Sequence, residues 1–114
     1  MGSCSGEGMI SFDEFKKMDL RVAKVLDVRD HPDADKLYVI QIDVGGQTRQ
    51  IVAGIRTQYP IEELLGRKIV MINNLEPVTI RGEESRGMLL AANDDGSPVI
   101  LVPERDVPSG TQIC

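Results

Sequence analysis

The sequence predicts a mainly β domain: a small closed barrel of five strands, with one short helix before the first strand and another between the third and fourth. Three observations predict it. Apolar and polar residues alternate along several segments, as they do in half-buried strands. Glycine-containing turn signals separate these segments. The two helical signals are brief. At 114 residues, 41% of them hydrophobic and 27% charged, the chain suits one domain with one core.

The first helical signal is a capping box. The Ser11 hydroxyl can accept a hydrogen bond from the amide of Glu14, while the Glu14 side chain reaches back to the Ser11 amide. Phe12, Phe15 and Met18 then recur on one helical face. We therefore expect a helix from residue 11 to about residue 18, with its aromatic side chains packed into the core.

Three strands follow this helix. Residues 20–28 alternate with one slip near residues 23–25, which indicates a bulge or strong curvature. Residues 36–44 alternate cleanly, Gly45-Gly46 makes a tight hairpin turn, and residues 47–53 return as the third strand. A curved first strand is what a small closed barrel needs.

The remaining elements complete the barrel. Residues 60–65 form a short helix with proline in its first turn and Gly66 as its stop. Strands follow at residues 67–72 and 87–92, and a turn at 93–97 leads to a further strand at 98–103. A helix between the third and fourth of five curved strands is the order of an OB-fold barrel. We expect a leader at residues 1–8 and one domain at 9–114, with a barrel at 9–92 and a β-rich C-terminal extension at 93–114.

Two connecting segments are candidates for function. The stretch His31-Pro-Asp-Ala-Asp35 could ligate a metal, but no second ligand cluster exists, so a turn capped by its aspartates is favoured. Residues 73–87 form a long connection with apolar anchors, which is unlike a disordered linker. Within it, the arginine of Arg81-Gly82 stands beside a residue without a Cβ, where backbone can approach a ligand closely. We interpret this connection as a presented binding loop.

Charge and composition limit the function. The net charge of −5 argues against broad nucleic-acid binding, although residues 49–87 hold six basic and five acidic side chains and are the least acidic part of the chain. The two cysteines, Cys4 and Cys114, form no zinc pattern; free thiols are favoured, and a disulfide between the termini stays open. There is no membrane span or signal peptide. One histidine and no glycine-rich phosphate loop predict a binding protein without catalytic residues, metal or cofactor.

Five motifs carry a resemblance to a known family. They are Asp19-Leu-Arg-Val22, His31-Pro-Asp-Ala-Asp-Lys-Leu-Tyr38, Gln50-Ile-Val-Ala-Gly54, Glu63-Leu-Leu-Gly66 and Asn74-Leu-Glu-Pro77 with Arg81-Gly-Glu-Glu-Ser-Arg-Gly-Met-Leu-Leu-Ala-Ala92. The chain resembles the tRNA-binding domain found as the C-terminal module of many methionyl-tRNA synthetases, in free-standing structure-specific tRNA-binding proteins and in the endothelial monocyte-activating polypeptide family.

The resemblance implies an OB-fold that binds tRNA without catalysing a reaction and that recognises the folded shape of the tRNA more than its sequence. It also implies a cytoplasmic homodimer joined through the C-terminal extension, working in cis or in trans with the catalytic domain of a methionyl-tRNA synthetase. Asn74, Arg81, Ser85 and Met88 match the family's groove residues. Each has a structural alternative: Asn74 can satisfy a strand end, Ser85 can cap the loop, and Met88 can belong to the core.

Other candidates come from the residues themselves. Tyr38 and Tyr59 are the plausible stacking platforms, and the basic side chains that could also meet phosphates are Lys36, Arg49 and Arg56 outside the loop and Arg86 within it. Many family members have lysines where this chain has Glu76 and Thr79, which predicts weaker phosphate binding. The alternative function is an OB-fold protein-interaction or chaperone-like dimer with a hydrophobic groove.

Overall fold

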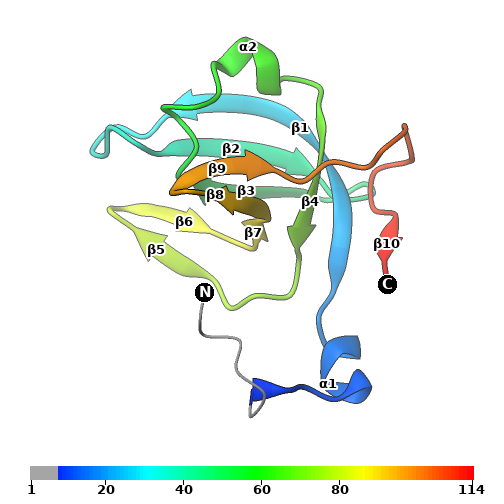
Figure 1. The fold of residues 1–114 in the computed structure, drawn as a ribbon. Coiled ribbons are helices and arrows are strands. Elements are labelled where there is room, and N and C mark those ends of the chain that lie inside the picture. Colours follow the sequence, from blue (N-terminus) through cyan, green and yellow to red (C-terminus); the bar gives the residue numbers. More distant parts are fainter. Residues whose placement is uncertain (1–7) are drawn as a thin grey trace.

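A computed structural model describes residues 8–114 of the chain, so the expected leader, apart from its last residue, and Cys4 lie outside the described residues. The sheet of the barrel has the antiparallel order β3-β2-β1-β4-β7, and β10 adds to the edge of β1 (Figure 1). These strands are β1 (Leu20–Asp30), β2 (Tyr38–Asp43), β3 (Thr48–Ala53), β4 (Lys68–Ile72), β7 (Met88–Leu89) and β10 (Gln112–Ile113). The predicted five-stranded OB-fold barrel is confirmed.

The first strand is long and strongly curved, as the slip in its pattern predicts. Its register against β2 shifts between Val25 and Asp27, so Leu26 is the bulged residue, slightly later than expected. Val25 is buried whereas Leu26 is 46% exposed. The curvature lets one strand pair with β4 along its first half and with β2 along its second half.

Nearly all of the core comes from the barrel strands, and in β2 and β3 neighbouring residues are buried as well as alternate ones. The side chains below 2% exposure are Ile40, Ile42, Ile51, Leu64, Ile69, Met71, Val25 and Val39. Among these, Leu64 belongs to α2 (Ile61–Leu64), the predicted helix between the third and fourth strands, which covers one end of the barrel (Figure 1). Pro60 precedes this helix and Gly66, at φ 79°, ends it.

The N-terminal helix forms where predicted but does not pack as predicted. Helix α1 (Phe12–Lys16) has both halves of its capping box, with distances of 3.1 Å between Ser11 and Glu14 in each direction. It contributes no buried residue, and Phe12 is 72% exposed. The barrel closes without it, because the strands and α2 already fill the interior. The expected aromatic plug is therefore wrong.

The C-terminal part leaves the barrel earlier than the predicted strand at 87–92. β7 ends at Leu89, and β8 (Ala91–Asp94) pairs with β9 (Ser97–Ile100) in a separate hairpin. The chain then returns to β1: the Val22 amide donates to the Thr111 carbonyl at 2.9 Å, and the Gly110 amide donates to the Val22 carbonyl. The tail thereby covers the part of the β1 edge that β2 leaves open. No helix in residues 8–114 is long and apolar enough to cross a membrane.

Candidate nucleic-acid interface

The long connection after β4 contains a small hairpin rather than an open loop. Strands β5 (Val78–Ile80) and β6 (Glu83–Ser85) pair around the two-residue turn Arg81-Gly82. Both turn residues have positive φ, 49° for Arg81 and 90° for Gly82, which suits the right-handed twist of the two strands. Figure 1 shows β5 and β6 as this hairpin, and the pairing of Ile80 with Glu83 puts Arg81 at its tip.

The Arg81 side chain is exposed but anchored. Its Nη1 donates a hydrogen bond of 2.8 Å to the main-chain oxygen of Asp33, in the segment between β1 and β2. Since a guanidinium has five N–H groups, this contact leaves most of its donors open to solvent. The arginine therefore joins two connections that flank one side of the barrel while still presenting a positive charge.

His31, which is buried, also joins the β5–β6 hairpin to the segment between β1 and β2. The ring is 2% exposed, and its Nδ1 lies 2.9 Å from the Asp33 amide, which has only a hydrogen to offer. Nδ1 must then be the acceptor, so the ring hydrogen is on Nε2, which donates to the Ile80 carbonyl at 2.9 Å. The predicted turn at residues 31–35 is confirmed. Among residues 8–114 no group of three or more metal-ligating side chains occurs, so these aspartates form no metal cluster there.

The base of the hairpin is fixed by polar contacts to the barrel. Glu83 accepts from Nη2 of Arg29 at 2.8 Å, and the Gln50 side chain donates to the Glu84 carbonyl at 2.9 Å. Ser85, 3% exposed, accepts from the Val52 amide at 2.9 Å and donates to the Gly87 carbonyl at 3.0 Å. Ser85 therefore bridges β3 to the end of the hairpin. Its expected contact with a ligand is replaced by this internal role, because both capacities of the hydroxyl are used.

Asn74 also holds the chain together. Its Oδ1 accepts from the Asp19 amide at 2.8 Å, and its Nδ2 donates to the Lys17 carbonyl at 2.6 Å, so it fastens the segment after α1 to the end of β4. The carboxylate of Asp19 accepts from Asn73 and from Arg21, and these two hydrogen bonds lower the pKa of Asp19. This is the structural alternative for Asn74: a side chain that satisfies the strand end.

Tyr38 and Met88 occupy different surroundings. Tyr38 is 4% exposed and its hydroxyl donates to the Tyr59 carbonyl at 2.7 Å; burial raises the pKa of this phenol. The expectation that Tyr38 is a stacking platform is wrong, because the ring belongs to the core. Met88 is 47% exposed, so it is not plain core, and it lines an apolar hollow of about 230 Å³ beside Pro98 and Ala91.

The basic candidates separate into two groups. Arg56 donates to the Ala34 carbonyl at 3.2 Å and pairs with Asp30 at 3.2 Å, so it fixes the segment between β1 and β2. Lys36 is exposed in that segment. Arg49 and Arg86, 37 positions apart in the sequence, line one hollow of about 220 Å³ together with Gln47 and Thr48. The structure thus brings Arg49 and Arg86 together at one place. At another place, Arg81 contacts the segment between β1 and β2 that contains Lys36.

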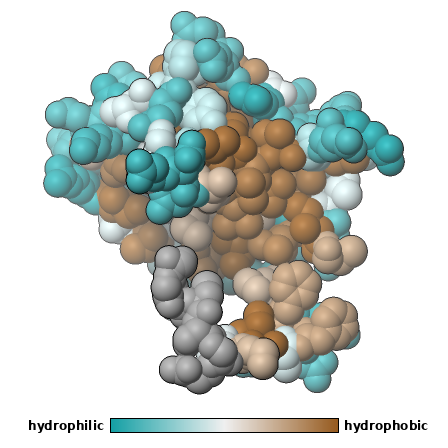
Figure 2. All heavy atoms as spheres, viewed as in Figure 1, coloured by the Kyte–Doolittle hydropathy of each residue, from teal (hydrophilic) through white to brown (hydrophobic). Residues whose placement is uncertain are grey.

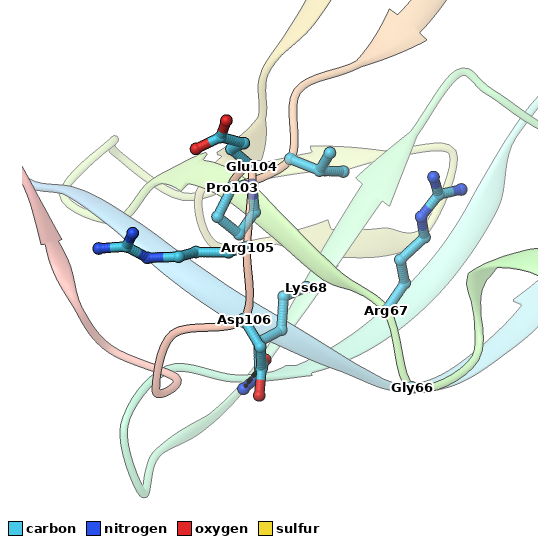
Figure 3. Close-up of a pocket in the computed structure, with 8 residues that line it drawn as sticks. Gly66, Arg67, Lys68, Pro103, Glu104, Arg105 and Asp106 are labelled. Carbon is cyan, nitrogen blue, oxygen red and sulfur yellow. Dashed lines mark hydrogen bonds and ion pairs between the residues drawn. The ribbon is translucent and has the colours of Figure 1, made fainter.

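A further hollow, of about 280 Å³, lies where the C-terminal segment crosses β4 (Figure 3). Lys68 donates to Asp106 at 2.8 Å and to the Val107 carbonyl at 2.6 Å, and the pKa of Asp106 is lowered by this hydrogen bond. The guanidinium groups of Arg67 and Arg105 point away from each other. This hollow therefore joins the tail to the barrel and offers no convergent set of donors.

The arrangement suits binding rather than catalysis. Its exposed groups are arginine, lysine, glutamine and threonine donors, which fit phosphate and hydroxyl acceptors. Sequence reasoning missed Arg29 and Gln50, which hold the hairpin. Arg29 lies 54 positions from Glu83, so no local pattern could reveal their pairing.

Comparison with known proteins agrees with this description. The family model described as "Putative tRNA binding domain" matches residues 20–112. A methionine–tRNA ligase of Thermococcus kodakarensis is 53% identical over 104 residues, which are 91% of this chain and 14% of the ligase. The chain thus spans about one seventh of the length of that curated relative.

Solved structures give the same grouping. A MetRS-related protein from Pyrococcus horikoshii superposes with a TM-score of 0.87 at 34% identity, covering 93% of this chain and 98% of that one. The chaperone CsaA of Bacillus anthracis superposes with a TM-score of 0.84 at 30% identity, covering 94% and 100%. With the family model covering most of its length, this chain belongs to the tRNA-binding domain family.

Proposed function

We propose that this domain binds tRNA without catalysing a reaction, as a module or subunit that assists a methionyl-tRNA synthetase in the cytoplasm. The observation that carries the proposal is the 53% identity to a methionine–tRNA ligase over 91% of the chain. The geometry supports it in two ways. Exposed basic side chains flank one side of the OB-fold barrel. Tyr38, the aromatic residue of β2 on which a base could have stacked, is buried. A module of this kind raises the effective concentration of tRNA at a catalytic domain.

Recognition by shape is supported by how few aromatic rings the surface offers, since Phe12 of α1 is the one that is mostly exposed in residues 8–114. A general single-strand binder stacks successive bases on exposed aromatic rings. Only 4% of this chain is aromatic, with no tryptophan, and Tyr38 is in the core. Phosphates and 2′-hydroxyls of a folded RNA can be bound by arginine, lysine and threonine without stacking.

The salt dependence of binding tests this function. If about three or four phosphates are neutralised, the log–log slope of affinity against salt should lie near −3, which is roughly a 60-fold loss of affinity between 50 and 200 mM salt. Fluorescence anisotropy with intact tRNA at several salt concentrations measures the slope. Intact tRNA should also compete far better than a single-stranded fragment of it. Equal competition by the fragment, or no tRNA binding at low salt, would contradict the proposal.

A chaperone-like activity is the second candidate, favoured by the superposition on CsaA and by exposed apolar surface. Figure 2 shows an apolar area across the middle of the face on which β9 lies. Val78, Met88, Val99, Leu101 and Val102 are each more than 40% exposed. Such a protein should suppress the aggregation of an unfolded client protein equally well at low and high salt. Its affinity for tRNA should then not depend on the salt concentration.

We also propose that the domain is a homodimer joined through its C-terminal extension. Val99, at the end of β9, and Leu101 and Val102, just after it, are 45%, 42% and 41% exposed, which is costly for a monomer in water. A second copy of the same segment would cover them.

Sedimentation velocity at micromolar concentration should therefore show a dimer. Replacement of Leu101 by glutamate should produce a folded monomer, because a charge on the apolar segment opposes burial. Lys24→Glu serves as the control, since Lys24 is an exposed charge on β1. A parent chain that sediments as a monomer would overturn the proposed dimer.

A further inference from the structure

A second cationic feature lies at the start of β3, at the opposite end of β6 from Arg81. It is the hollow of about 220 Å³ lined by Gln47, Thr48, Arg49 and Arg86. Every one of these four side chains carries a hydrogen-bond donor, and none is a carboxylate. In the hollow of Figure 3, by contrast, Glu104 and Asp106 stand among the basic residues.

The Arg49 guanidinium is not used inside the protein. Its backbone is held in the ladder opposite Ile42 and the residue is half-buried, yet its side chain makes no hydrogen bond or ion pair with any residue from 8 to 114. The positive charge of Arg49 contributes to the lowered pKa of Asp19, but the Asp19 carboxylate is already bound by Arg21 at 2.6 Å and by Asn73 at 3.0 Å. Arg49 is therefore an uncompensated charge on a rigid strand.

Arg86 is placed beside it by the main chain. Its amide donates to the Gln50 carbonyl at 2.8 Å, which fixes its backbone against β3. Its side chain meets Glu84 at 3.3 Å, with both side chains about half exposed, 54% and 51%. An exposed pair of this kind contributes little, so a stronger anion can displace Glu84.

We propose that the hollow between Arg49 and Arg86 binds one phosphodiester group of an RNA backbone. This rests on the proposed tRNA-binding function and adds a defined subsite to it. Two guanidinium forks with a threonine hydroxyl and an amide match the oxygens of a phosphate. The lining holds no aromatic ring on which a base could stack.

This phosphate differs from any that Arg81 contacts. Arg81 and Arg86 are five residues apart along the arm of the hairpin, so their Cα atoms are separated by roughly 15 Å at about 3.3 Å per strand residue. While the hairpin is docked on β3, the two contacts have a fixed spacing. A pair of phosphate sites at fixed spacing selects the shape of an RNA rather than its sequence.

The test compares Arg49→Gln, Arg86→Gln and the double variant, with Arg67→Gln and Arg105→Gln as controls from the hollow of Figure 3. Fluorescence anisotropy with intact tRNA gives affinity and salt slope for each. Each single substitution should weaken binding about tenfold near 0.1 M salt, as for a charged hydrogen bond, with little change in the slope, because the remaining arginine still neutralises the shared phosphate. The double variant should lose about one unit of slope rather than two.

The possible results test the phosphate subsite separately from the proposed tRNA-binding function. If the parent binds tRNA but the Arg49 and Arg86 variants behave like the two controls, the subsite is overturned and the function stands. If the double variant loses two units of slope, the arginines contact different phosphates and the shared subsite is overturned. An oligoglutamate peptide that competes as well as tRNA would assign the hollow to protein carboxylates instead. A parent without tRNA affinity overturns both proposals. Circular dichroism confirms that each variant is folded.

Discussion

Replacement of Gly87 by alanine is expected to destabilise the domain by about 3 kcal/mol, from backbone strain and overpacking together. Gly87 has φ 104°, a conformation that residues with a Cβ rarely adopt. A Cβ built there would lie 2.7 Å from the Ile72 carbonyl oxygen and 2.9 Å from Cε of Met71. Neither neighbour can withdraw easily, because Ile72 is part of β4 and Met71 is fully buried.

Thermal unfolding measures this effect, and a loss of about 10–15 °C in Tm is expected for a domain of this size. Gly82→Ala is the matched control. Gly82 also has positive φ, 90°, but a Cβ there meets nothing within 4 Å, so only backbone strain of about 1 kcal/mol should remain. Equal losses in the two variants would mean that the close approach of Gly87 to β4 contributes nothing.

Replacement of Arg81 by alanine is expected to weaken tRNA binding by about 1–3 kcal/mol, or roughly 5- to 150-fold. The guanidinium lies at the hairpin tip with one N–H group on the Asp33 carbonyl and its other donors open to solvent. It can therefore hold the hairpin in place and bind a phosphate at the same time. Arg81→Lys keeps the charge but loses the planar fork, so its affinity should lie between those of the parent and the alanine variant.

The salt slope distinguishes the two contributions of Arg81. Loss of a phosphate contact should lower the slope by about one unit, whereas a looser hairpin should weaken binding without changing the slope. Anisotropy at several salt concentrations gives both quantities, and circular dichroism checks the fold. If Arg81→Ala binds tRNA as well as the parent does, the hairpin tip is outside the interface.

The barrel could be predicted because its signals are local. Alternation in β1, β2 and β3, the turn at Gly45-Gly46 and the stop at Gly66 are each contained in a few consecutive residues. The packing of α1 could not be predicted in the same way. An apolar helical face shows that a helix is amphipathic, but not which surface it meets, and Phe12 remains 72% exposed.

The hairpin after β4 was missed for a different reason. Its strands have three residues each, and its turn is Arg81-Gly82 rather than one of the Asn-Gly or Asp-Gly pairs typical of such turns. The prediction of Asn74 and Ser85 as ligand contacts rests on their match to the family's groove residues. Their partners, Asp19 and Val52, lie 55 and 33 positions away, so the sequence could not show that these side chains were already used. Tyr38 was misplaced because both faces of β2 are largely buried.

The polar attachment of the β5–β6 hairpin has a consequence for the kinetics of recognition. The hairpin is held by a hydrogen bond from its Arg81 guanidinium and by hydrogen bonds to its carbonyls, the Glu83 carboxylate and the Ser85 hydroxyl, whereas Val78 is 51% exposed and Ile80 only half-buried. Little apolar surface holds it down, so the hairpin can detach at a lower free energy than the barrel needs to unfold. The docked hairpin, which is the form proposed to bind RNA, is then one state of a local equilibrium. The apparent affinity for RNA is proportional to the population of this state. His31, Arg29 and Gln50 hold the hairpin in its docked state, so substitutions of these residues should lower the population of that state and, with it, the proposed affinity for RNA.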